Sequence, residues 1–437
     1  MAGRLSPRLC AAALGCALIA LNAGTAWASG FFIREQSSTA QGNAFAGATA
    51  GADDISYMFF NPAGITRHDE SQVVGAMSYI IPVSRAKDLE GTTAAGATIQ
   101  GGSNSGDIGE DALVPALYAM WVANEDLRFG LGINAPFGLV TDNESDYVGR
   151  YPGTRSELES ININPVVAYK LTDWMSVGAG LQVQYVETQL QNAVDFGLIG
   201  GVNTGGDPAT DGDANLRGDD LGFGFNAGIL FEPFDGTRIG FSYRSEVNHD
   251  IEGNVDINNP LAAGVSTSAQ AQFTSPDIWR FGVHQDITDE WAVMADFSYT
   301  DWSDFNELRI EIDGQPDNVT VEDWDDTVFV AVGVTYKPEQ VEGLTLRLGG
   351  AFDQTPIPDD TRTPRIPGNN RYWVSLGVGY QPFDWAEMTF SYTHVFIEDG
   401  DIDLSIADDP NNATRGNLTG TYEQHIDIFT IGGRLIF

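Results

Sequence analysis

The chain has 437 residues, of which 42% are hydrophobic and 11% aromatic, and its formal net charge is −39. So large an acidic excess excludes nucleic acid as a partner, and the aromatic content excludes a disordered chain. No apolar run of 18 or more residues follows the N-terminal segment, so the sequence predicts no transmembrane helix beyond it.

Residues 1–28 have the features of a secretory signal peptide. Two arginines precede an apolar stretch, and Ala26-Trp27-Ala28 forms a small-x-small cleavage motif. Cleavage there predicts a mature chain that begins at Ser29. Cys10 and Cys16 would leave with the signal peptide, so we expect the mature chain to have no disulfide and no free thiol.

The region from Gln72 to the end repeats one pattern, in which apolar alternation is followed by a turn or loop. In residues 328–336, valines and a tyrosine at every second position alternate with mostly small or polar residues, which is typical of a strand with two unlike faces. A soluble β-sandwich and an outer-membrane β-barrel both use such strands. The length of the runs, about nine residues, and the aromatic residues at their ends favour the barrel, as Tyr372 and Tyr380 illustrate.

We predict an all-β fold, an antiparallel transmembrane β-barrel of fourteen strands. Short and long connections alternate along the chain, as periplasmic turns and extracellular loops do in such barrels. The final strand ends on an apolar face with Phe437, which resembles an outer-membrane assembly signal. The predicted strands are 72–83, 112–123, 127–138, 156–171, 175–190, 222–232, 237–250, 273–287, 290–308, 326–337, 344–355, 371–382, 386–397 and 423–437.

The segment from Ser29 to Thr66 does not share the strand pattern. It is rich in Gly, Ala and Ser, carries several aromatic residues and ends in Asn61-Pro62-Ala63-Gly64. A wall of about 14 strands encloses a space that its own side chains do not fill. We therefore expect three domains: the signal peptide over 1–28, an N-terminal plug or hatch over 29–70, and the barrel over 71–437.

The strand register places several basic residues inside the predicted barrel. Buried charges need partners, so one interpretation is that they pair with acids of the wall and of the plug, such as Glu35, Asp53 and Asp54. The other is that one or two attract a ligand carboxylate, for which Arg280 and Arg347 are the candidates. The predicted inward cations are Arg128, Lys170, Arg238, Arg280, Arg347 and Arg434.

Two blocks of sequence resemble the FadL-type outer-membrane transporters of long-chain fatty acids and other hydrophobic compounds. The first block spans residues 30–66 and includes Gly30-Phe31-Phe32, Gly42-Asn43-Ala44-Phe45-Ala46-Gly47 and Asn61-Pro62-Ala63-Gly64. The second spans residues 130–151 and includes Gly132-Ile133-Asn134-Ala135-Pro136-Phe137-Gly138.

The resemblance implies that a hydrophobic molecule is caught at extracellular loops, moves to a lumen pocket and exits sideways through an opening in the wall at a kinked third strand. By this resemblance, Gly30, Phe31 and Phe32 would line the pocket. Asn61, Pro62 and Ala63 would mark the plug motif, and Asn134, Pro136 and Gly138 would shape the kink. The resemblance also implies a monomer in the outer membrane of a Gram-negative bacterium.

The kink has support from the residues themselves. Pro136 has no backbone N–H and opens strand pairing locally, and glycines lie on both sides of it. The alternative is a simple strand end near the membrane interface. The catching loops are expected at 191–221 and 251–272, where apolar pieces lie among Asp and Asn.

The sequence lacks the motifs of common enzymes and of cofactor or metal sites. No nucleophile elbow or phosphate-binding glycine loop occurs, so we expect neither an enzyme nor a cofactor. The run from Asp211 begins like a calcium loop but has Leu216 where Gly is required, so no metal site is predicted. A porin for polar solutes remains the alternative function. Besides the substrate, the expected partners are outer-membrane lipid and lipopolysaccharide.

Overall fold

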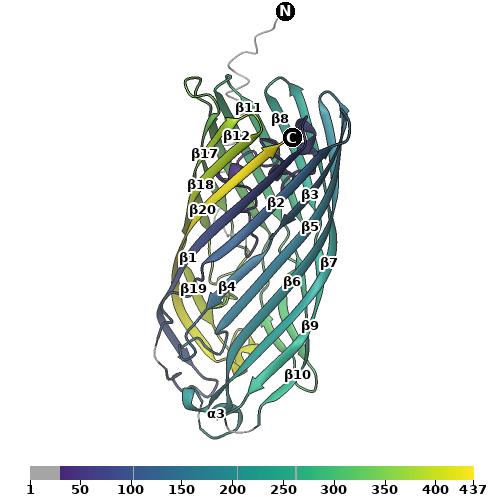
Figure 1. The fold of residues 1–437 in the computed structure, drawn as a ribbon. Coiled ribbons are helices and arrows are strands. Elements are labelled where there is room, and N and C mark those ends of the chain that lie inside the picture. The colour runs from purple at the N-terminus through teal and green to yellow at the C-terminus, as the bar shows by residue number, and fades with distance from the viewer. Residues whose placement is uncertain (1–29, 102, 204, 261–262) are drawn as a thin grey trace, which may run out of the picture.

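The computed structural model describes residues 30–437 except residues 102, 204 and 261–262. The predicted signal peptide and its cleavage site lie outside the described residues. The chain forms an elongated barrel of tilted strands, with the N-terminal segment inside it, in the half that carries the C-terminus (Figure 1).

Within the described residues, twenty strands form one antiparallel sheet. Their bounds are β1 Gln72–Thr92, β2 Ala112–Val122, β3 Leu127–Asn134, β4 Gly138–Asp142, β5 Arg155–Thr172, β6 Met175–Asp195, β7 Asp211–Phe234, β8 Thr237–Arg244, β9 Val247–Asn258, β10 Val265–Ser275, β11 Ile278–Asp286, β12 Trp291–Thr300, β13 Glu307–Ile312, β14 Asn318–Val321, β15 Thr327–Tyr336, β16 Leu344–Asp353, β17 Arg371–Phe383, β18 Ala386–Ile397, β19 Gly400–Leu404 and β20 Asn417–Ile436.

The sheet closes on itself because β1 pairs with both β2 and β20. Six of the named strands (β4, β9, β10, β13, β14 and β19) continue a neighbouring strand of the same crossing, so the described chain crosses the wall fourteen times. The predicted fold class, a 14-stranded antiparallel β-barrel, is confirmed. Closure joins the first and last crossings, so the barrel has no free end strand of the kind that hydrocarbon does not tolerate.

The alternating pattern of the sequence separates the two faces of the wall. Along β17, Tyr372, Val374, Leu376, Val378 and Tyr380 are between 43% and 53% exposed, whereas their neighbours point inward and are more buried. Aromatic residues such as Trp121, Trp279 and Phe390 are exposed on the same outer face of other strands. This apolar exterior matches a barrel that faces lipid.

Several predicted strand bounds are wrong, and the errors have one main cause. β6 continues to Asp195 and β7 begins at Asp211, so about half of the region 191–221 is paired strand, and residues 251–272 are largely β9 and β10. Outside the bilayer the outward face of a strand can be polar, so these extensions lack the apolar exterior that marks a membrane crossing. Their apolar residues, such as Leu216, Val255 and Ala269, are buried on the inward face instead. The region between β6 and β7 retains short helices, α3 Phe196–Ile199 and η3 Pro208–Thr210.

Four predicted strands are interrupted. The region 127–138 breaks after Asn134, 237–250 breaks between β8 and β9, 273–287 breaks between β10 and β11, and 290–308 ends as a strand at Thr300 before β13. At the β8–β9 break, Ser245 bonds to Phe225 through its backbone N–H and also accepts from the Phe225 N–H with its hydroxyl. A side chain there replaces one ladder bond, which a period-2 pattern cannot reveal.

The N-terminal segment folds into short helices with side-chain caps at their starts. They are α2 Ser38–Gln41, η1 Ile55–Phe59 and η2 Pro62–Arg67. Far along the chain, the short helix η4 Pro410–Thr414 precedes β20. Ser37, Asp54 and Asn61 accept from backbone N–H groups of the first turns. None of the helices in the described residues is long and apolar enough to cross a membrane.

Glycines on the inner face of the wall let this segment approach closely. A Cβ atom built on Gly349 would lie 2.0 Å from the carbonyl oxygen of Asn43, and one on Gly240 would lie 2.0 Å from the carbonyl oxygen of Thr49. No side chain fits there. The small residues of the wall and of residues 30–70 therefore form one packed interior.

Candidate functional site

The wall has a break between β2 and the β3–β4 region. β3 ends at Asn134 and β4 begins at Gly138, with Pro136 in the gap. Pairing of β2 with β3 runs from Val122 only as far as Leu117, so residues 112–116 of β2 have no ladder partner on that side. The missing N–H of Pro136 fits this interruption. The predicted kink residues thus lie together at an opening in the sheet.

The N-terminal segment covers this break from inside. The Ile33 N–H donates to the Pro136 carbonyl at 2.8 Å, and the Gly138 N–H donates to the Phe31 carbonyl at 3.1 Å. These two bonds place Phe32 opposite Phe137 as an antiparallel bridge. Residues 31–33 therefore act as a short extra strand for the kinked segment.

Gln36 adds a second fastening to the same segment. Its side-chain amide donates to the Ala135 carbonyl at 2.7 Å, and its side-chain oxygen accepts from the Ala135 N–H at 3.3 Å. Ser160 of β5 pairs with both backbone groups of Phe137 in the same manner, at 2.9 and 2.6 Å. Side chains thus satisfy the backbone N–H and carbonyl groups of Ala135 and Phe137, as buried groups require.

A cavity of about 430 Å³ lies at the break, and we call it the gate cavity. On the lumen side it is bounded by Gly30, Phe31 and Phe32. On the other side it reaches Leu113 and Ile161, which are 64% and 54% exposed on the outer face of the wall. An apolar space thus extends from the lumen to the lipid-facing surface.

A second apolar cavity of about 80 Å³ lies toward the long loops, and we call it the upper cavity. Its walls include Leu190, Leu216, Ile251, Phe273 and Phe305. Four residues line both cavities, namely Phe31, Leu139, Leu158 and Ile366. These side chains separate the upper cavity from the gate cavity.

Phe31 is held at this boundary by other aromatic rings. Its ring centroid lies 5.1 Å from Trp302, 5.6 Å from Trp324 and 5.5 Å from Phe273. Gly30 has a φ of +57°, and a Cβ there would lie 2.7 Å from the Trp324 ring, so this position requires glycine. The aromatic packing fixes the start of the described chain between the two cavities.

Charged groups lie at the inner edge of the gate cavity. Arg371 donates to the Gly30 carbonyl at 3.1 Å. Burial raises the pKa of Glu35 to about 7, an effect that its backbone hydrogen bond and the charges of Arg371 and Arg34 reduce. Arg34 in turn pairs with Asp353 at 3.6 Å, both side chains being buried. The buried charge of Arg34 is thus compensated by an acid of the wall.

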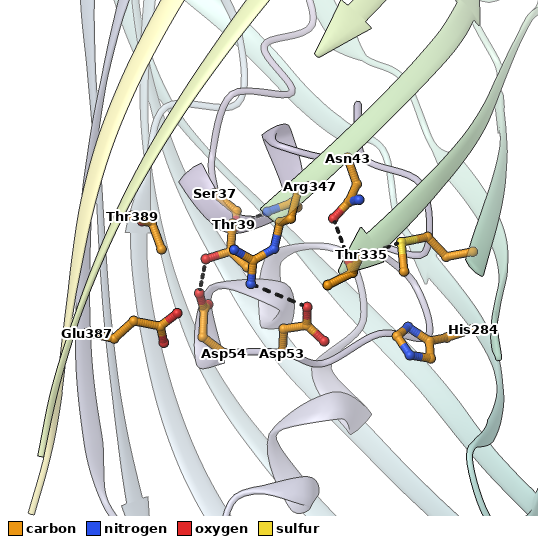
Figure 2. Close-up of polar contacts among 12 residues, drawn as sticks. Ser37, Thr39, Asn43, Asp53, Asp54, His284, Thr335, Arg347, Glu387 and Thr389 are labelled. Carbon is orange, nitrogen blue, oxygen red and sulfur yellow. Dashed lines mark hydrogen bonds and ion pairs between the residues drawn. The ribbon is translucent and has the colours of Figure 1, made fainter. Parts of the chain in front are cut away.

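The two candidate arginines lie outside both apolar cavities. Arg347 of β16 forms an ion pair with Asp53 at 3.7 Å, as Figure 2 shows. Arg280 of β11 is 3% exposed and has no carboxylate within ion-pair distance among the described residues. Its guanidinium lies 5.8 Å from the ring centroids of Phe32 and Phe60. The two candidates therefore differ in their surroundings: Arg347 is paired with a carboxylate, whereas Arg280 lies beside aromatic rings.

The Asn61-Pro62-Ala63 motif lies away from the cavities and joins the plug segment to the wall. The Asn61 side chain accepts from the Ala63 N–H at 3.0 Å and donates to the carbonyls of Thr49 and Ile229 at 2.8 and 3.1 Å. Pro62 occupies the first turn of η2, where a missing N–H is tolerated. The motif is therefore placed to anchor the plug segment, and it does not contact the gate cavity.

Sequence reasoning missed several residues of the site. Gln36, Trp302, Trp324, Ile366 and Arg371 come from distant parts of the chain and carry no local motif. Gln36 lies inside the N-terminal block, where nothing in the sequence distinguishes it from the other polar residues around it. Within the described residues, no group of three or more His, Cys, Asp or Glu side chains is arranged to hold a metal ion.

Comparison with known proteins identifies the family of this chain. Residues 19–437 match the family model described as outer membrane protein transport protein, OMPP1/FadL/TodX. The chain belongs to this family. The FadL-type resemblance and the outer-membrane location of a Gram-negative bacterium are thereby confirmed.

The FadL/TodX relatives cover most of the chain. A long-chain fatty acid transport protein of Escherichia coli O6:H1 is 30% identical over 420 residues, which is 88% of each chain. The crystal structure of a Pseudomonas aeruginosa FadL homologue matches 93% of this chain and 99% of its own, with a TM-score of 0.86 and 22% identity. The toluene transporter TodX of Pseudomonas putida covers 88% and 94%, with a TM-score of 0.66 and 17% identity. These structural matches show the fold.

Proposed function

We propose that this outer-membrane transport protein takes up long-chain fatty acids or other hydrophobic compounds and releases them sideways into the membrane. The observation that supports this most strongly is the gate cavity, an apolar space that reaches from Phe31 in the lumen to Leu113 and Ile161 on the outer wall. A lateral path suits a hydrophobic molecule because it never has to enter bulk water.

The upper cavity is the proposed route from the extracellular side. Capture occurs at the strand extensions and loops formed by residues 191–221 and 251–272. The molecule then passes Phe305 and Phe273 toward Phe31. A displacement of Phe31 joins the upper cavity to the gate cavity, because both share its ring as a wall.

Opening requires the segment 30–36 to leave the break. The rest of the plug over 37–70 stays in place in this proposal, because wall residues hold its backbone. Asp296 accepts from the Thr49 N–H at 2.8 Å, Asn43 donates to the Val334 carbonyl at 2.8 Å, and Arg244 donates to the Phe59 carbonyl at 3.0 Å. The moving part is thus a short segment attached to a fixed body.

The two arginines have different proposed roles. Arg347 is proposed as a partner of the plug, since it already forms an ion pair with Asp53. Arg280 has a buried guanidinium beside Phe32, with two nitrogen atoms that lack hydrogen-bond partners among the described residues. A carboxylate that follows an apolar chain past Phe32 would compensate this charge. Arg280 is therefore the proposed partner of an acidic substrate.

The remaining expectations belong to the same proposal. The protein acts as a monomer after removal of residues 1–28, surrounded by outer-membrane lipid and lipopolysaccharide at its apolar exterior. The porin alternative needs an open lumen, whereas residues 34–66 are buried apart from a partly exposed Asp53. A hydrophobic transporter is the better fit to a filled barrel.

Native mass spectrometry of the full-length protein extracted from an outer membrane tests the proposal. We expect a copurified hydrophobic molecule whose occupancy falls at least tenfold in the double variant Phe31→Ala, Phe32→Ala. The matched control is Phe241→Ala, Phe281→Ala, which removes two neighbouring rings from the outer wall. An empty protein that conducts ions steadily across a planar bilayer would refute the proposal and favour the porin.

A further inference from the structure

A third cavity lies on the opposite side of the plug from the two apolar cavities. It has a volume of about 370 Å³, room for roughly a dozen water molecules at about 30 Å³ each, and it is lined by charged residues. It reaches the turn between β11 and β12 and shares no lining residue with the gate cavity or the upper cavity. Because short turns face the periplasm, we call it the periplasmic cavity.

Arg238 of β8 is the side chain that makes this cavity unusual. It is 8% exposed and lines the cavity. Its Nε atom is buried without a hydrogen-bond partner, and no carboxylate of the described residues lies within ion-pair distance of its guanidinium. A buried cation without a partner is costly, so its surroundings favour an anion.

Other charged groups line the cavity with Arg238: the cations Arg67, Lys337 and Arg434, and the acids Asp53, Asp286, Asp289 and Glu290. Arg434 lines the cavity and donates to the Asp53 carbonyl at 3.2 Å and to Glu387 at 3.3 Å. Lys337, which directly follows β15, also lines the cavity and makes no side-chain ion pair within the described chain. His284 is bound to Asp286 at 3.0 Å at the cavity wall.

Asp53 is the carboxylate of the N-terminal segment that lines this cavity. Its pKa is lowered below its usual range because Arg347, His284, Arg238 and Lys337 together outweigh burial, which is the largest single effect and acts in the opposite direction. Figure 2 shows Asp53 between Arg347 and His284, with Glu387 on the other side. One plug carboxylate thus serves several cations.

We propose that the periplasmic cavity binds a small oxyanion, a phosphate or a carboxylate group, between Arg238, Lys337 and Arg434. Arg238 supplies the buried donors, and the more exposed Lys337 supplies charge at the side that solvent reaches. The acids of the β11–β12 turn, Asp289 and Glu290, also line the cavity, so the site selects a compact anion that reaches past them. This site is separate from the proposed hydrophobic route.

Calorimetric titration of the full-length protein in detergent tests this site, with inorganic phosphate and acetate as separate probes at low salt. We expect saturable binding of at least one probe, weakened at least tenfold in Arg238→Gln and about threefold in Lys337→Gln. Arg85→Gln is the control, because Arg85 is exposed and pairs with Asp107 outside the cavity. Preference for phosphate would indicate a phosphorylated ligand, and preference for acetate a carboxylated one.

Absence of saturable binding of both probes would overturn the proposal, as would equal affinity in the parent protein and Arg238→Gln. If Arg238→Gln fails to fold, Lys337→Gln decides, because its side chain is exposed and its loss leaves the wall intact; an unchanged affinity there refutes the site. The copurified hydrophobic molecule is expected to persist in all three variants, so the outcome is independent of the proposed transport function.

Discussion

Gln36 provides the sharpest perturbation of the closed wall. In Gln36→Leu the side chain keeps a similar size, but the N–H and carbonyl of Ala135 both lose their partner. A buried hydrogen bond contributes about 1 kcal/mol and an unsatisfied group costs about 1–3 kcal/mol. A weakening of about 2 kcal/mol raises the population of the displaced segment about 30-fold.

The readout is the labelling rate of a single cysteine placed at position 137. Phe137 is 2% exposed in the closed structure, and the predicted mature chain has no other cysteine. We expect Gln36→Leu to raise the rate 10- to 30-fold in outer-membrane vesicles. Gln41→Leu is the matched control, because Gln41 is equally buried in the plug but bonds to Thr393 and Thr430. Equal rates in the two variants would refute the reasoning.

Two further predictions concern the plug. Gly349→Val places a side chain 2.0 Å from the Asn43 carbonyl oxygen, so we expect a lower yield of heat-resistant folded barrel or a new ion conductance. The control is Gly75→Val, whose nearest neighbour is 3.9 Å away and which is expected to behave as the parent protein. Equal behaviour of the two variants would contradict the packing account. Burial raises the pKa of Glu35 from 4.5 to about 7, so the cost of ionising it in the folded protein grows as the pH rises from 4.5 to 7. We therefore expect Glu35→Gln to stabilise the protein by up to about 3 kcal/mol at pH 8 and to have no such effect at pH 4. Urea midpoints at the two pH values measure this effect, and a gain of equal size at both would exclude the titration of Glu35 as its cause.

Much of the wall is predictable because lipid imposes a local rule. A strand such as β15 alternates every second residue between an apolar exterior and a small or polar interior, and its bounds agree with the prediction within one residue at each end. Beyond the bilayer this rule lapses. Asp213 and Asp219 of β7 are paired with β6 and also with β9 although the outward face of the strand is polar there, so the sequence indicates a loop.

The site is less predictable because its contacts are non-local. Pro136 signals a break in pairing from its own chemistry, and Phe31 and Phe32 are apolar enough to indicate a buried N-terminus. The bond between Gln36 and Ala135 spans 99 residues, and Ile366 reaches the cavities from an irregular segment between β16 and β17. No period or motif of the sequence encodes such contacts, which arise only when the barrel closes.

A reversible staple across the break tests the central claim, that residues 30–36 must leave the kinked segment for transport. Phe32 and Phe137 face each other as a non-hydrogen-bonded antiparallel pair, with an expected Cα separation of about 4.5 Å, which suits a disulfide. Uptake of a labelled long-chain fatty acid is measured in cells that carry Phe32→Cys, Phe137→Cys, with each single variant as control.

The account predicts that oxidation of the double variant blocks uptake at least tenfold and that a reducing agent restores it to the level of the single variants. Full uptake by the oxidised protein, with the disulfide verified by mass spectrometry, would contradict the account, because the wall would then remain sealed at this break while transport continued.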